Sequence, residues 1–103
     1  MKGTEKQIKW AEDIKAQAIN SCKARIAANN NIGMFADENE LYEIVIKGLE
    51  TVFAKIDDAA VIITKRHMFD YRTIEGNVRQ AMTLIKRGNL TVEQFAKANG
   101  VSR

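Results

Sequence analysis

The chain has 103 residues, enough for one compact domain and too few for two of ordinary size. Apolar residues make up 46% and charged residues 28%, so a hydrophobic core can form beneath a solvated surface. Sixteen Lys and Arg against thirteen Asp and Glu give a net charge of +3, which by itself implies no nucleic-acid partner. The single cysteine excludes an internal disulfide, and one cysteine with one histidine argues against an all-protein zinc site.

The sequence shows no signal for secretion or membrane insertion. Its first residues are polar and lead into a charged amphipathic segment, unlike a signal peptide. The longest apolar run covers 59–63, whereas a bilayer requires about 20 residues. We therefore expect a cytoplasmic protein that makes no contact with a membrane.

The first predicted helix covers about residues 4–28. Thr4 and Gln7 have the spacing of a capping box, in which each side chain bonds the other residue's backbone N–H. One face then repeats apolar residues at helical spacing: Ile8, Ala11, Ala18, Cys22 and Ile26. Trp10 lies at the edge of that face, and the Asn-rich stretch up to Gly33 is expected to end the helix.

Residues 29–37 are predicted to be irregular, with Met34 and Phe35 tucked into the core. Asp37 is expected to open a second helix over 38–56. This helix has a broad apolar face, which indicates a central helix or one that meets a second chain, and Gly48 beside it permits close approach. The residues that we propose for a protein interface are Trp10, Tyr42, Ile46 and Phe53.

Three shorter helices are predicted over 58–69, 73–87 and 91–99. Asp57 or Asp58 caps the first, with one bent rod formed by the second and third helices as the alternative. Thr73 is expected to cap the next, and Thr91 begins a further capping box. We find no alternating strand pattern of useful length. The sequence thus predicts an all-α protein, with four or five helices in a single domain over residues 1–103.

No catalytic site is predicted. Cys22 lies on the buried face of the first helix and His67 in a basic stretch, so both have structural explanations. The carboxylate pairs are adjacent in sequence and point to different faces of a helix. No phosphate-binding glycine loop or nucleophile motif is present. We therefore expect a protein that is not an enzyme and has no catalytic residue, cofactor or metal.

Basic residues concentrate in segment 65–87, which holds six of them against two acidic residues. Four recur every seven positions and would form one stripe on a continuous helix. The candidate nucleic-acid-binding residues are Lys65, Arg66, Arg72, Arg79, Lys86 and Arg87. Such a stripe can contact successive phosphates. The other interpretation is that these residues are the solvated face of a helix, and a turn near Asp70 to Thr73 would break the stripe.

Residues 3–15, GTEKQIKWAEDIK, resemble a motif in small, mostly uncharacterised proteins of bacteria, phages and mobile elements. Those proteins often carry a second element, AKWWIDNR, whose counterpart here is AAVIITKR at 59–66, without the tryptophans and the Asp-Asn pair. The resemblance implies a small helical domain in a bacterial or phage setting and transfers no catalytic residue. If it extends to an ion pair between Arg66 and the first helix, Glu12 or Asp13 is the expected acid.

Two functions remain as hypotheses. The first is a non-enzymatic protein-interaction domain that binds a host protein or a second copy of itself, such as an inhibitor of a host defence system. The second is a nucleic-acid-binding accessory protein that uses the basic 65–87 segment. Salt distinguishes them, because binding to nucleic acid weakens steeply as salt rises.

Overall fold

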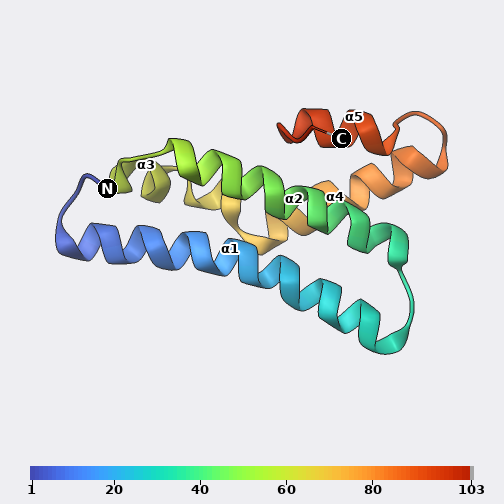
Figure 1. The fold of residues 1–103 in the computed structure, drawn as a ribbon, viewed down its shortest axis with the longest axis horizontal. Helices are drawn as coiled ribbons and strands as arrows, with labels where there is room; N and C mark the ends of the chain where they lie inside the picture. Colours follow the sequence, from blue (N-terminus) through green and yellow to red (C-terminus); the bar gives the residue numbers. More distant parts are fainter. Residues whose placement is uncertain (103) are drawn as a thin grey trace.

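The computed structural model describes residues 1–102 and confirms the predicted all-α class. The elements are α1 (Glu5–Ile32), α2 (Ala36–Lys55), α3 (Ala59–Thr64), the 3-10 helix η1 (Arg66–Phe69), α4 (Tyr71–Lys86) and α5 (Val92–Ala98). The helices α1 and α2 form a long antiparallel hairpin, while α5 lies along α2 (Figure 1). None of the helices in this range is long and apolar enough to cross a membrane.

The first helix begins as predicted and ends later. The Gln7 N–H donates to Thr4 Oγ1 at 3.2 Å and the Thr4 N–H donates to Gln7 Oε1 at 3.0 Å, which completes the capping box. The predicted end near residue 28 is wrong, because α1 continues to Ile32. The Asn29 side chain bonds across to α2 instead of capping its own helix, and the helix ends at Gly33, which is left-handed with φ 67°.

The predicted irregular stretch over 29–37 reduces to a short turn. The expectation that Met34 and Phe35 enter the core is wrong, since both are exposed. The expected Asp37 cap is also wrong: α2 begins at Ala36, after Phe35, and no side chain caps it. The Asn39 N–H donates to the Phe35 carbonyl at 3.1 Å, so the first helical bond starts ahead of Asp37.

Helices α2 and α3 are separate, which settles the alternative left open by the sequence. The N-terminal segment pairs with their junction: the Lys2 N–H donates to the Asp57 carbonyl and the Ala59 N–H to the Lys2 carbonyl, both at 2.8 Å. Asp58 then caps α3 by accepting from the Ala60 N–H. A Cβ at Gly3 would lie 3.0 Å from that of Ala59, and Gly3 has φ 137°, so both the close approach and the backbone favour glycine here.

The predicted helix over 58–69 divides into α3 and η1, and α4 starts two residues before the expected Thr73 cap. Asp70 caps α4, because its carboxylate accepts from the Arg72 N–H at 2.9 Å. The Thr73 hydroxyl instead donates to the His67 carbonyl at 2.9 Å, which ties η1 to α4. The Thr91 capping box of α5 is as predicted.

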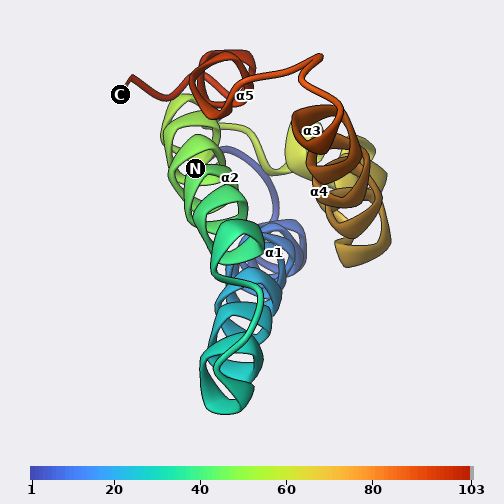
Figure 2. The same cartoon turned by 90° about the vertical axis from the view of Figure 1, so that its right-hand side faces the viewer.

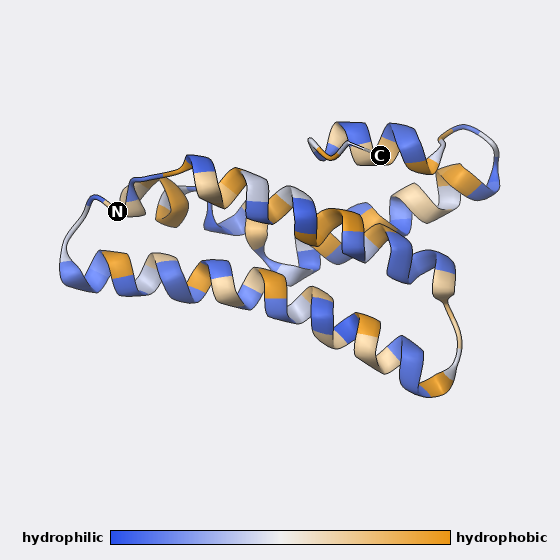
Figure 3. Cartoon of the chain, viewed as in Figure 1, coloured by the Kyte–Doolittle hydropathy of each residue, from blue (hydrophilic) through white to orange (hydrophobic). Residues whose placement is uncertain are grey.

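Helix α2 is the central element of the core. Its apolar side chains form one buried cluster with residues of α1, η1, α4 and α5. Apolar residues recur at intervals along the helices between hydrophilic ones (Figure 3). A Cβ at Gly48 would lie 2.7 Å from the Asn99 carbonyl oxygen, so this glycine allows the end of α5 to pack on α2. A smaller cluster of Ala11, Ala59 and Ile62 joins α1 to α3.

Candidate interaction surfaces

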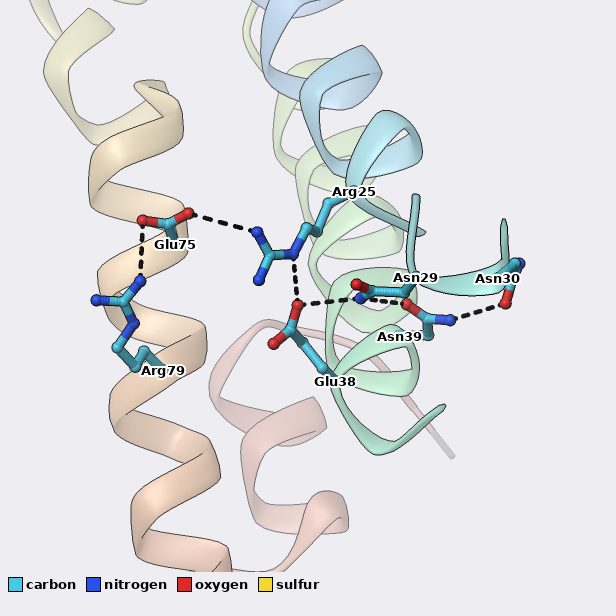
Figure 4. Close-up of polar contacts among 7 residues, drawn as sticks. All are labelled: Arg25, Asn29, Asn30, Glu38, Asn39, Glu75 and Arg79. Carbon is cyan, nitrogen blue, oxygen red and sulfur yellow. Dashed lines mark hydrogen bonds and ion pairs between the residues drawn. The ribbon is translucent and has the colours of Figure 1, made fainter. Parts of the chain in front are cut away.

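A partly buried polar network holds the end of the α1–α2 hairpin that is distant from the chain's N-terminus (Figure 4). Arg25 Nε donates to Glu38 Oε1 at 2.7 Å, and Asn29 Nδ2 donates to the same oxygen at 3.0 Å. Asn29 Nδ2 also donates to Asn39 Oδ1 at 2.9 Å, and Asn39 Nδ2 to Asn30 Oδ1 at 2.9 Å. Four side-chain bonds therefore fix this end of α1 to the start of α2.

The network is ionised at neutral pH and extends to α4. Burial alone would raise the pKa of Glu38, but the bonds from Arg25 and Asn29 outweigh it and lower the pKa below its usual value. The hydrogen bond between Arg25 and Glu38 also raises the pKa of Arg25. Arg25 Nη1 also lies 4.0 Å from Glu75 Oε2, and Arg79 Nη2 lies 3.3 Å from Glu75 Oε1 (Figure 4). Two arginines and two glutamates thus balance their charges where the distal hairpin meets α4.

Three large apolar side chains are exposed at the turn between α1 and α2. Ile32, Met34 and Phe35, which we call the hairpin tip, are exposed by 59%, 57% and 50%. Phe35 also has φ 64°, and no other residue except glycine has a positive φ in the described chain. A bulky residue in this conformation costs about 1–3 kcal/mol and persists only where its surroundings enforce it. The tip therefore combines exposed apolar surface with backbone strain.

Trp10 and Arg66 form a second exposed feature. The Trp10 ring is 48% exposed, and the Arg66 guanidinium lies over it, 5.4 Å from the ring centroid. Arg66 Nη1 donates to the Ile63 carbonyl at 2.8 Å. Glu12, one of the two acids expected for Arg66, instead pairs with Lys15 at 3.1 Å. The arginine is therefore held by an aromatic ring and a carbonyl, and the rest of its guanidinium stays open to a ligand.

A groove of about 880 Å³ runs beside Trp10. One wall is the first half of α1; the other is η1 with the first residues of α4. The groove combines the aromatic rings of Trp10, Phe69 and Tyr71 with the charged groups of Asp13 and Arg66. Such a mixture of rings and polar groups suits a protein segment better than a polyanion, since Asp70 adds a further negative charge to the lining.

The other three residues proposed for a protein interface are buried or half-buried in the chain's own core. Tyr42 and Phe53 are buried, and Ile46 is half-buried. Burial, and then a hydrogen bond with Tyr71, raises the pKa of Tyr42. The Phe53 ring packs edge-on against Phe69 with centroids 4.8 Å apart. The broad apolar face of α2 is therefore occupied by the chain's own core, and Trp10 is the exposed member of the proposed set.

The candidate nucleic-acid-binding residues do not form one stripe. Arg72, Arg79 and Lys86 share an exposed face of α4, which is uninterrupted, and Arg87 follows at its end. Lys65 and Arg66, however, belong to the end of α3 and to η1, ahead of the turn at Asp70. Arg79 is also partly neutralised by Glu75. The structure thus joins half of the predicted set on one helix.

Cys22 and His67 lie in different environments. Cys22 is fully buried, and burial raises the pKa of its thiol to about 11, so it stays protonated at neutral pH. His67 is exposed in η1. Within residues 1–102 no group of three or more His, Cys, Asp or Glu side chains is placed to hold a metal ion.

Comparison with known proteins assigns no family to this chain. The chain was compared with protein-family models, with curated proteins and with solved structures, and none of these comparisons found a match. The hairpin tip, the groove and the basic face of α4 are the candidate interaction surfaces of the described residues.

Proposed function

We propose that this chain is a non-enzymatic protein-interaction domain of the phage or mobile-element type, which binds a host protein or a second copy of itself. The observation that carries the proposal is the hairpin tip. Ile32, Met34 and Phe35 face water while the chain buries smaller apolar residues elsewhere. Exposed apolar clusters mark binding surfaces, and strained backbone concentrates at functional sites.

The network beneath the tip supports a binding role. Asn29, Asn39 and Glu38 fix the two helices on either side of the turn before any partner arrives. A surface fixed in its bound shape loses less conformational entropy on association, which raises affinity. Phe35 supplies an aromatic anchor of the kind that dominates binding energy in protein interfaces. An inhibitor of a host defence system belongs to this class of protein.

Site-specific photo-crosslinking in bacterial cells tests the proposal. A photoreactive amino acid at Met34 is expected to give discrete covalent adducts, of this chain with itself or with another protein. The same amino acid at Gln80, which is exposed on α4, serves as the matched control and is expected to give none. Equal labelling from both positions, or no adduct from Met34, would contradict a binding role for the tip.

One observation favours nucleic-acid binding as a second candidate: Arg72, Arg79 and Lys86 share one exposed helix face. Arg72→Gln/Lys86→Gln removes two charges and leaves the Arg79–Glu75 pair intact. If this face binds DNA or RNA, fluorescence anisotropy must show affinity that falls with salt. The variant must then flatten the log–log salt dependence by about 1.5. Absence of binding at low salt eliminates this candidate.

A further inference from the structure

The groove runs along one face of α1, and the hairpin tip begins at the C-terminal end of the same helix. A single line of residues at alternating spacings of four and three connects them. This line, which we call the α1 seam, comprises Trp10, Ile14, Gln17, Ser21, Ala24, Ala28 and Asn31. Such spacing keeps side chains on one side of an α-helix. The first four line the groove, and the last three are exposed beyond it.

The distal part of the seam is accessible to another chain. Figure 2 shows the far end of the hairpin extending away from α3, α4 and α5. The radius of gyration is 14.6 Å, against about 13 Å for a compact domain of this length. Ala24 and Ala28 are small and exposed, so a second helix can approach closely at this point.

Building on the proposed function, we propose that the partner is a second copy of this chain. The two α1 helices pack antiparallel along their seams, and each hairpin tip enters the groove of the other copy beside Trp10. Trp10 and Ile32 are 22 positions apart, about 33 Å along the helix. A two-fold axis near Ser21 places Trp10 of each copy opposite Ile32 of the other. Both tip–groove contacts then form together, as a two-fold interface requires.

The seam is complementary to itself under this symmetry. The same axis sets the larger Ile14 opposite the small Ala28, and Gln17 close to Ala24. Large side chains thus meet small ones along the helix pair, which allows close interdigitation. The seam contains no charged residue, so packing it against its equal buries no unpaired charge at the centre.

Charge favours the same arrangement. Asp37 is exposed two residues after the tip, and Arg66 is exposed beside Trp10. The antiparallel arrangement brings Asp37 of one copy toward Arg66 of the other, at both ends of the interface. The tip carries no charge, so it meets no repulsion from Asp13 and Asp70 in the groove. Opposite charges at the rim set the orientation of the two copies.

Sedimentation equilibrium over a concentration series tests this dimer. The wild-type chain is expected to be a reversible dimer. Phe35→Asp removes the tip and Ala24→Arg blocks the seam, and each should raise the dimer dissociation constant by at least about tenfold. Gln80→Arg, an equally bulky change on exposed α4 surface, should leave it unchanged. A Ser21→Cys variant near the axis should form a disulfide-linked dimer on mild oxidation, and Gln80→Cys should not.

The possible outcomes separate this inference from the proposed function. A wild-type chain that is monomeric at every concentration overturns the dimer, and so does a dimer that Ala24→Arg does not weaken. If Met34 crosslinks only to a different protein in those cases, the proposed interaction function stands. Only the proposal that the partner is a second copy of this chain is then wrong. If the chain is monomeric and Met34 gives no adduct, both are wrong.

Discussion

The two ends of the α1–α2 hairpin are held by different chemistry. At the end near the N-terminus, Ala11, Ala59 and Ile62 are fully buried and join α1 to α3 by apolar packing. At the distal end, Asn29 and Asn39 are the buried polar residues and bond α1 to α2 directly. Because directional bonds hold the distal end, its large apolar side chains need not turn inward. The exposed tip is a consequence of this division of roles.

The strongest effect is expected at the apolar end. Ile62→Ala removes a completely buried side chain and should lower the free energy of unfolding by about 2–5 kcal/mol. Urea denaturation measures the change. Its neighbour Ile63 is only half-buried, so Ile63→Ala is the matched control and should cost clearly less. Equal losses would show that α3 does not dock through Ile62.

A smaller and more local effect is expected at the polar end. Asn39→Ala leaves Asn29 and Asn30 without their shared partner and should cost about 1–3 kcal/mol. Amide hydrogen exchange should accelerate around the turn and much less in α4, because the network holds only the distal hairpin. Acceleration spread evenly over all helices would contradict the separation of the two ends.

The polar end should also respond to acid. The pKa of Glu38 is lower in the folded chain than in the unfolded chain, so its ionisation stabilises the fold above the unfolded value of about 4.3. That stabilisation is lost as pH falls through the lowered pKa. Urea unfolding should therefore show Glu38→Gln as less stable than wild type at pH 7, and the difference in unfolding free energy should shrink as pH falls below the unfolded value. A difference in unfolding free energy that does not change with pH would argue against an ionised Glu38 in the bond with Arg25.

The sequence predicts the helices more securely than the site. Threonine caps at Thr4 and Thr91 depend on neighbours three residues away, so local pattern is enough to find them. The polar network joins residues about ten positions apart, and nothing local distinguishes Asn29 as a network member from Asn29 as a helix terminator. That ambiguity shortened the predicted α1.

The exposure of the hairpin tip is likewise not predictable from local sequence. Met34 and Phe35 are apolar, so burial is the default expectation, and their exposure follows from the network beneath them. Tyr42 and Phe53 show the reverse, because α4, α5 and η1 cover a face that the sequence offers equally to a partner. The sequence does contain one signal: Ile32, Met34 and Phe35 are three large apolar residues within four positions, next to three asparagines and Gly33.

Replacing Phe35 by glycine tests the central claim most directly, because the claim assigns this residue a cost in folding and a gain in binding. At φ 64° glycine relieves the strain, although its freedom in the unfolded chain offsets part of the gain. Phe35→Gly should therefore raise the free energy of unfolding by about 0.5–1 kcal/mol at concentrations where the chain is monomeric. The same variant should lose the Met34 crosslinks and the dimer. A less stable variant, or one that associates as well as wild type, would show that Phe35 serves its own fold and would contradict the account.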